Sequence, residues 1–168
     1  MNFELGLYDP EQTYSGQKKF DCEHAVINKF VSSSLKQQVK KNTSVAYVLT
    51  DPAFDNKFIG FFTLVMSCLD NSTLLLHGAS LPRQVPCVRL VMLGIDKAYK
   101  GNHLGLRLLK HALMKTKESA NVLGCRGLYL DADHAAVAFY TKYGFIALEK
   151  PAQAGGSTPR FLFLESFF

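Results

Sequence analysis

The sequence predicts one α/β or α+β domain over residues 1–168, with a mixed central β-sheet of about six to seven strands flanked by helices. Three observations lead to this prediction. A chain of 168 residues has the length of one domain, since domains commonly hold about 100–200 residues. A composition of 48% hydrophobic and 20% charged residues can supply a core without a disulfide or metal staple. Strand-like and helix-like hydrophobic periods also follow one another along the chain.

The first part of the chain predicts a strand, a helix and a hairpin. Residues 3–8 alternate between apolar and polar or small residues and stop at Asp9-Pro10, which is typical of a strand ending in a turn. From Ala25 to Val39, apolar residues recur at steps of three and four, which predicts one amphipathic helix. Residues 44–50 and 58–66 are apolar runs on either side of a turn-rich segment, so we expect them to form a hairpin.

The second part predicts strands that alternate with helices. Residues 87–96 form a run apolar enough for a central strand, and Gly94 within it predicts a bulge or a close approach of the backbone. A glycine-bearing turn then opens a helix. The further expected elements are a strand at 127–131, a helix at 135–143 closed by Gly144, and a terminal strand at 161–168.

Several classes of protein and site lack their sequence signals. The four cysteines are widely scattered without a C-x-x-C pair, which favours reduced thiols over a zinc or redox site. The first twelve residues do not resemble a secretory signal. The longest uncharged run, residues 58–69, is shorter than the ~20 apolar residues of a membrane span. We therefore expect a soluble, cytoplasmic protein that does not use a membrane.

The charge is basic and unevenly distributed. Nineteen Lys and Arg against fourteen Asp and Glu give a net charge of +5 and a pI near 9.0, which favours anionic partners only weakly. The lysines of the first quarter form the clearest cluster. They are Lys18, Lys19, Lys29, Lys36, Lys40 and Lys41.

The turn from Lys100 to Gly105 has the form of an anion site. A short glycine-bearing turn before a helix presents unpaired N–H groups and the positive end of the helix dipole. The segment lacks both the G-x-x-x-x-G-K-[ST] and the G-x-G-x-x-G pattern, which disfavours nucleoside triphosphate and dinucleotide sites. A pyrophosphate cradle of another type and a purely structural loop remain open.

This turn, together with the segment from Ala138 to Phe145, resembles the GNAT superfamily of acetyl-CoA-dependent N-acetyltransferases. In that family a Q/R-x-x-G-x-G/A turn holds the pyrophosphate of coenzyme A, and here His103 stands where the first glycine belongs. The resemblance implies acetyl-CoA as co-substrate and no metal. The residues that it implies for the cofactor are Leu93, Gly94, Ile95, Lys100, Gly101, Asn102, His103, Leu104, Gly105, Leu106, Phe139 and Tyr143.

A narrower resemblance covers most of the chain. Phe20-Asp21-Cys22-Glu23 and Ile27-Asn28-Lys29-Phe30-Val31 look like the F-D-C-G-x-x-x-L-N-x-F-L signature of the GNAT toxins of bacterial toxin–antitoxin pairs, with Glu23 in place of the glycine. The run 90–96 resembles their L-G-R-L-A-[VI]-D strand, with Val91 and Met92 in place of Gly-Arg. Such toxins acetylate the α-amine of an aminoacyl-tRNA and are neutralised by a ribbon-helix-helix antitoxin, and family members are often homodimers.

The resemblance also assigns a mechanism. It gives Tyr140 the role of general acid, which protonates the departing thiolate of coenzyme A. An α-amine has a pKa of about 7.7–8.0, so a strong general base is not required. Two alternatives stay open: a GNAT enzyme that acetylates a small amine or a protein amine, and a degenerate acetyl-CoA-binding module without toxin activity.

Overall fold

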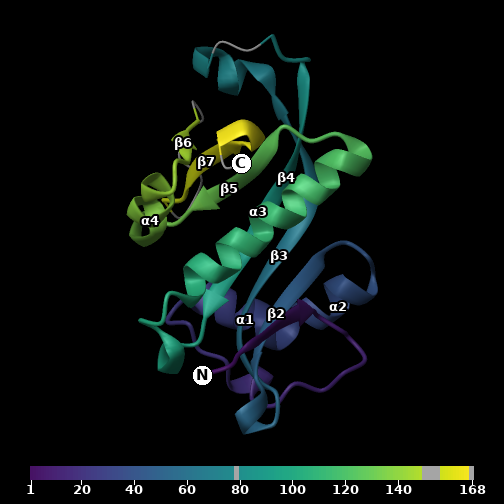
Figure 1. Ribbon diagram of the computed structural model, residues 1–168, viewed down its shortest axis with the longest axis vertical. Coiled ribbons are helices and arrows are strands. Elements are labelled where there is room, and N and C mark those ends of the chain that lie inside the picture. The colour runs from purple at the N-terminus through teal and green to yellow at the C-terminus, as the bar shows by residue number, and fades with distance from the viewer. Residues whose placement is uncertain (78–79, 149–155, 167–168) are drawn as a thin grey trace. The chain divides into compact units, whose positions relative to one another are not determined.

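The computed structural model describes residues 1–77, 80–148 and 156–166, and seven strands in these ranges form one sheet with the order β1-β2-β3-β4-β5-β7-β6 (Figure 1). The strands are β1 (Glu4–Leu7), β2 (Val45–Asp51), β3 (Lys57–Asp70), β4 (Gln84–Ile95), β5 (Gly127–Ala132), β6 (Ile146–Ala147) and β7 (Thr158–Phe163). The α-helices are α1 (Ala25–Ser33), α2 (Leu35–Lys40), α3 (Leu104–Leu123) and α4 (Val137–Lys142). Short 3₁₀ helices cover Gln17–Lys19, Pro52–Phe54, Asn71–His77, Lys97–Tyr99, His134–Ala136 and Leu164–Ser166.

The sheet is mixed, which confirms the predicted fold class. β1 pairs antiparallel with β2, and β2 pairs antiparallel with β3, so the predicted hairpin is present. β4 and β5 run parallel, and β7 lies antiparallel to both β5 and β6. A β-meander followed by a β-α-β-α-β succession is what the alternating hydrophobic periods predict.

The chain divides into two compact units, which are described separately. The first unit holds residues 1–65 and 91–112, and the second holds residues 66–90 and 113–168.

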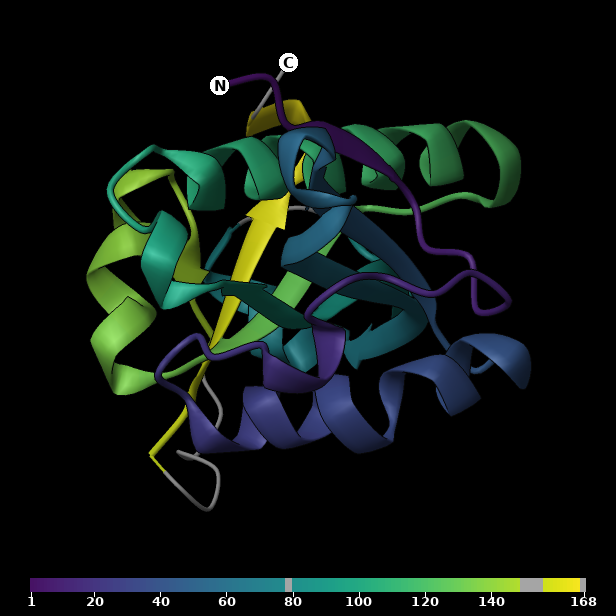
Figure 2. The same cartoon turned by 90° about the horizontal axis from the view of Figure 1, so that it is seen from below.

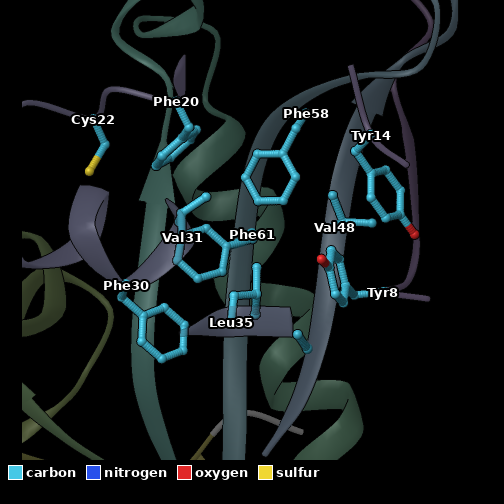
Figure 3. Close-up of a cluster of buried hydrophobic side chains, with 11 residues drawn as sticks. Tyr8, Tyr14, Phe20, Cys22, Phe30, Val31, Leu35, Val48, Phe58 and Phe61 are labelled. Carbon is cyan, nitrogen blue, oxygen red and sulfur yellow. The ribbon is translucent and has the colours of Figure 1, made fainter. Parts of the chain in front are cut away.

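Aromatic packing dominates the core of the first unit (Figure 3). The ring of Phe61 on β3 stacks with Phe30 on α1 at 6.1 Å between centroids, and it meets the edge of Phe20 at 5.7 Å. Phe58 and Phe61 are fully buried. Fully burying such a side chain contributes about 1.5–3 kcal/mol, so this cluster fixes α1 and the loop before it against the sheet.

Helices cover both faces of the sheet in the first unit (Figure 2). Phe61 points toward α1, whereas its neighbour Phe62 lies 6.0 Å from the ring of His111 on α3. Successive side chains of a strand point to opposite faces. The long apolar run of β3 is therefore explained by burial on two faces.

The second unit has its own core around β5 and β7. Phe161 is fully buried and meets the edge of Phe163 at 4.9 Å. A Cβ at Gly127 would lie only 2.1 Å from the carbonyl oxygen of Leu162. Close pairing of β5 with β7 at this point therefore requires glycine.

Two predicted elements are wrong in their extent. The helix expected from Ala25 to Val39 is broken at Ser34, whose φ of −121° lies outside the helical range. The hydroxyls of Ser32 and Ser33 both donate to the carbonyl of Lys29, at 3.1 and 2.6 Å. Serine hydroxyls compete for helical backbone groups in this way, which weakens the helix where three serines follow one another.

The terminal strand begins earlier than predicted. β7 starts at Thr158, ends at Phe163 and gives way to a 3₁₀ helix at Leu164–Ser166. Phe167 and Phe168, the end of the predicted strand, lie outside the described residues. Pro159 stands in this strand and cannot donate a hydrogen bond to the ladder, so the start of the strand gives no clear signal in the sequence.

The prediction of a close backbone approach at Gly94 is confirmed. A Cβ at Gly94 would lie 3.2 Å from Ile27 Cγ2 and 3.3 Å from both Cys22 Sγ and Phe20 Cζ. The side chains of the loop before α1 and of α1 itself therefore rest directly on the backbone of β4. A larger residue at this position would press against these three side chains, so glycine serves the packing here and not a special backbone conformation.

Candidate functional site

The turn before α3 is built from short local bonds. The carboxylate of Asp96 accepts the N–H of Ala98 at 3.0 Å and so caps the 3₁₀ helix that follows β4. Gly101 then takes a φ of 85° and His103 a φ of 54°, both in the left-handed region. The carbonyl of His103 accepts the N–H of Arg107 at 3.1 Å, which starts α3.

The residues of this turn can accommodate a phosphate group. A Cβ added at Gly101 or at Gly105 would meet nothing within 4 Å, so open space lies over both backbone positions. Lys100, Asn102 and His103 are exposed. The first N–H groups of a helix have no partner within the helix, and the helix dipole favours an anion beside them. The turn is thus open on the side where an anion could reach these backbone positions.

The loop from Phe20 to His24 is tied to this turn by hydrogen bonds. The side-chain carbonyl of Asn28 accepts the N–H of Cys22 at 2.9 Å, and its amide donates to Asp21 Oδ1 at 2.8 Å. The N–H of Lys97 donates to the carbonyl of Asp21 at 2.8 Å. The F-D-C segment singled out in the sequence therefore holds the end of β4 and the turn before α3 in register with α1.

Two ion pairs join the same loop to the same turn. Lys97 Nζ lies 2.7 Å from Asp21 Oδ2, and Lys100 Nζ pairs with Glu23 Oε2. The bond from Lys97, with the hydrogen bonds from Glu23 N–H and Asn28, lowers the pKa of Asp21 to about 2. Asp21 is therefore ionised at neutral pH. The partner effect is reciprocal, since Asp21 raises the pKa of Lys97.

The end of β4 carries the residues that the family resemblance assigns to pantetheine. Leu93 is half-buried, whereas Gly94 and Ile95 are buried. Within the described residues, the ladder between β4 and β5 consists of the pairs Val88–Leu128 and Arg89–Tyr129 and does not include these three residues. Their backbone groups on that edge are thus outside the ladder.

The second unit places four aromatic residues together, two in α4 and two just after it. Tyr140 is buried and meets the ring of Phe139 at 5.1 Å and the ring of Phe145 at 5.4 Å, both edge to face. Phe139 also meets Tyr143 at 5.1 Å. Gly144, with a φ of 88°, ends the helix as predicted, because glycine adopts this conformation without a steric penalty.

Burial changes the acidity of Tyr140. Loss of solvent, with a smaller effect from the charge of Asp133, raises the pKa of Tyr140 to about 12. The hydroxyl is therefore fully protonated at neutral pH. A buried, protonated hydroxyl can donate a proton or a hydrogen bond, but it cannot act as a base.

A basic hollow lies beside α1 and α2 in the first unit. Its volume is about 840 Å³, and its described lining contains no carboxylate. The lining includes Lys18, Lys19, Lys36, Gln12, Gln17 and Gln37. These three lysines form no ion pair within the described part of the chain, whereas Lys40 pairs with Glu11 at 2.8 Å. Amide and ammonium donors without a competing carboxylate suit a phosphate chain.

The polar cluster after β5 has a structural arrangement. Asp131 accepts hydrogen bonds from Arg89 Nη2 at 2.9 Å and from the hydroxyl of Tyr129 at 2.8 Å. Asp133 stands at the N-cap of the following 3₁₀ helix, but its side chain makes no capping bond there. In the described ranges, no group of three or more His, Cys, Asp and Glu residues is arranged to hold a metal ion.

Sequence reasoning missed the residues that fix the loop. His24 caps α1, since its Nδ1 accepts the N–H of Ile27 at 3.4 Å, and this position before an amphipathic run was the available signal. The pairing of Glu23 with Lys100 joins residues 77 positions apart. Nothing in a linear pattern could indicate it.

Among the described helices, none has the length and apolar content needed to cross a bilayer.

Comparisons with known proteins place this geometry in a family. The family model for the acetyltransferase (GNAT) domain matches residues 10–159. The crystal structure of a bacterial toxin is similar at 35% identity and a TM-score of 0.92, over 98% of this chain and 92% of that chain.

Two structures of AtaT share the fold at 24% identity. One is a mutant toxin bound to the C-terminus of the antitoxin AtaR and acetyl-CoA, with a TM-score of 0.79 over 98% of this chain and 94% of that chain. The other is complexed with acetyl-methionyl-tRNAfMet, with a TM-score of 0.87 over 98% of this chain and 96% of that chain. The family model and the 35% identical toxin confirm the predicted resemblance, and the chain belongs to the GNAT family of acetyltransferases.

Proposed function

We propose that the protein is an acetyl-CoA-dependent N-acetyltransferase that blocks translation by acetylating the α-amine of an aminoacyl-tRNA. The observation that carries this proposal is the match over 98% of the chain to bacterial toxins of the same fold, one of them solved with acetyl-methionyl-tRNA. A ribosomal substrate of this kind is found in the cytoplasm, which is the expected location. The two units then work together as one GNAT domain over residues 1–168.

The turn before α3 holds the diphosphate of coenzyme A in this proposal. Backbone N–H groups from Gly101 to Leu106 are the donors, and the open space over Gly101 and Gly105 accommodates the phosphate oxygens. Lys100, Asn102 and His103 are exposed side chains at the rim. Leu104 is 7% exposed and anchors the first turn of α3.

The edge of β4 receives the pantetheine arm. Backbone groups of Leu93, Gly94 and Ile95 outside the β4–β5 ladder can pair with its amides, as an added strand would. A backbone N–H in this stretch can also polarise the thioester carbonyl. The family resemblance assigns Phe139 and Tyr143 of the second unit to the apolar walls for the arm.

Tyr140 is the general acid. The neutral acceptor amine attacks the thioester carbon, the carbon–sulfur bond breaks, and the phenolic proton passes to the departing sulfur while the amine loses a proton to solvent. Burial raises the pKa of Tyr140 to about 12, so the hydroxyl holds its proton at any physiological pH, and the same shift makes it a weaker proton donor than an ordinary tyrosine. General acids of this kind contribute about 10²–10⁴-fold to rate.

The basic hollow beside α1 and α2 holds phosphates of the tRNA. Three lysines without ion pairs in the described residues supply the charge, and the glutamines supply hydrogen bonds. Replacing Lys18, Lys19 and Lys36 together with Gln should weaken tRNA binding and reduce its salt dependence. A control of equal charge change replaces three lysines of α3, Lys110, Lys115 and Lys117, of which Lys115 is paired with Glu118 at 2.8 Å, and should have a smaller effect.

A protein partner is part of the proposal. AtaT binds the C-terminus of an antitoxin, and by analogy we expect this chain to be neutralised by an antitoxin of ribbon-helix-helix fold. We further expect a homodimer, as the family resemblance implies. Light scattering of the purified protein, alone and with an antitoxin, tests both expectations.

The deciding experiment measures acetyl transfer to several acceptors. Purified protein is incubated with radiolabelled acetyl-CoA and a pool of aminoacylated tRNA, with deacylated tRNA, free amines and a peptide as parallel acceptors. Label in charged tRNA alone supports the proposal, and sequencing the labelled tRNA names the substrate. Label in small amines or protein leaves an acetyltransferase of another specificity, and acetyl-CoA binding without transfer indicates a binding module.

A further inference from the structure

The loop from Asp21 to Glu23 places a carboxylate against each of the two lysines that precede Gly101. We propose that Glu23 limits the affinity of the turn before α3 for acetyl-CoA by pairing with Lys100, so that the cofactor diphosphate has to displace this carboxylate to reach the lysine. The inference rests on the proposed function, because it concerns the same cofactor site. It assigns a role to a residue at which the sequence departs from the toxin motif that it resembles.

Glu23 is held in place from the backbone. It adopts a φ of 65°, in the left-handed region that an L-residue rarely occupies. Its N–H donates to Asp21 Oδ1 at 2.9 Å. The same carboxylate of Asp21 pairs with Lys97 and accepts the amide of Asn28. The backbone of Glu23 is therefore held in place, and its side chain extends toward Lys100.

Each of the two lysines of the turn is paired with a carboxylate. Lys97 is paired with Asp21, and Lys100 is paired with Glu23. When a diphosphate approaches the open space over Gly101 and Gly105, both of these lysines are already paired with a carboxylate. The diphosphate also meets the negative charge of Glu23, which repels it.

The pair is exposed enough to open. The side chain of Lys100 is 49% exposed and that of Glu23 is 61% exposed. Exposed ion pairs are weak and are screened by salt. A diphosphate carries more charge than one carboxylate and gains the helix N–H groups in addition. The diphosphate can therefore displace Glu23 and pair with Lys100 itself. Breaking the ion pair lowers the affinity for the cofactor, and an uncharged side chain at position 23 would remove this loss.

Calorimetry of acetyl-CoA binding tests the inference. We expect Glu23→Gln to lower the Kd for acetyl-CoA about two- to fivefold near 50 mM salt, which is the range of an exposed ion pair. The gain should shrink below about 1.5-fold near 0.5 M salt, where screening acts within ~5 Å. The matched control is Glu11→Gln, which breaks an exposed Lys–Glu pair elsewhere in the first unit and changes the net charge equally.

Two further measurements separate charge from shape. A thioester without phosphates, S-acetylpantetheine, should show the same KM with the wild-type protein and with Glu23→Gln. In a Lys100→Gln background, the gain from Glu23→Gln should be smaller than in the wild type, because the lysine that it releases is gone.

The outcomes distinguish the inference from the proposed function. A wild-type protein that does not bind acetyl-CoA overturns the proposed function and the inference with it. If the wild type binds acetyl-CoA but Glu23→Gln binds equally or more weakly, only the inference is wrong. Equal tightening by Glu11→Gln, or an equal gain in the Lys100→Gln background, also overturns it, because the effect would then be one of net charge.

Discussion

The turn before α3 and the segment around α4 differ in how far they keep the residues of their family. In the motifs that the sequence resembles, His103 stands at a glycine position of the turn, and Glu23 stands at a glycine position of the loop bonded to it. Both residues nevertheless keep the left-handed backbone, at φ values of 54° and 65°. In α4, by contrast, Tyr140 and the terminal Gly144 are retained.

The difference follows from which atoms carry the chemistry. At the turn, backbone N–H groups are the proposed anion donors, so any side chain is tolerated that leaves the conformation and the open space intact. At α4, the proposed reacting group is the side-chain hydroxyl of Tyr140, and no backbone group can replace it. Substitutions in the two regions should therefore have effects of very different size.

Removal of the hydroxyl of Tyr140 should have the largest effect. We expect Tyr140→Phe to lower kcat at least tenfold while the Kd for acetyl-CoA changes less than twofold, because the ring contacts with Phe139 and Phe145 remain. Single-turnover transfer and calorimetry measure the two quantities. Tyr143→Phe is the control and should change kcat less than threefold. Unchanged turnover in Tyr140→Phe would remove this residue from the mechanism.

A methyl group at Gly94 should destabilise the first unit. The new Cβ would lie 3.2 to 3.3 Å from side-chain atoms of Ile27, Cys22 and Phe20. Overpacking of this kind costs about 1–3 kcal/mol, which urea unfolding can measure. Gly6→Ala on β1 is the control, since its Cβ would meet nothing within 4 Å. Equal stability of the two variants would show that the side chains of the loop before α1 shift to accommodate the methyl group at little cost in free energy.

A methyl group at Gly105 should separate stability from binding. This Cβ would meet no protein atom within 4 Å, and Ala is a better helix former than Gly by up to about 1 kcal/mol, so the stability should be unchanged or higher. The methyl group would occupy the space proposed for the diphosphate. We expect a Kd for acetyl-CoA roughly tenfold weaker, or about 1.4 kcal/mol. Binding as tight as in the wild type would place the phosphates elsewhere.

Local patterns in the sequence predicted most elements and much of the site, whereas long-range partners stayed hidden. The hydrophobic period predicted the strands β2 to β5. The positions of the glycines predicted the close approach at Gly94 and the end of α4 at Gly144. The break at Ser34 depends on competing hydroxyl bonds, which a hydrophobic period does not reveal. The pairing of Glu23 with Lys100 joins residues 77 positions apart, so only the folded structure reveals it.

Replacing His103 with glycine should have a small stabilising effect. An L-residue in the left-handed region carries a cost of about 1–2 kcal/mol, and the greater freedom of glycine in the unfolded chain offsets part of the gain. We therefore expect His103→Gly to raise the free energy of unfolding by roughly 0.5 kcal/mol. Thermal unfolding monitored by circular dichroism measures this. A lower Tm would indicate that the imidazole makes a stabilising contact.

The smallest expected effect is the lack of an alkaline decline in activity. Because burial raises the pKa of Tyr140 to about 12, its hydroxyl keeps the proton through pH 10. The value of kcat/KM should thus rise as the acceptor amine loses its proton near pH 7.7–8.0 and then remain level. Initial rates between pH 6 and 10, corrected for hydrolysis of the aminoacyl ester, test this. A tyrosine at its ordinary pKa of about 10 would be half ionised at the upper limit. A decline between pH 9 and 10 that is absent in Tyr140→Phe would show that Tyr140 is solvated during the reaction.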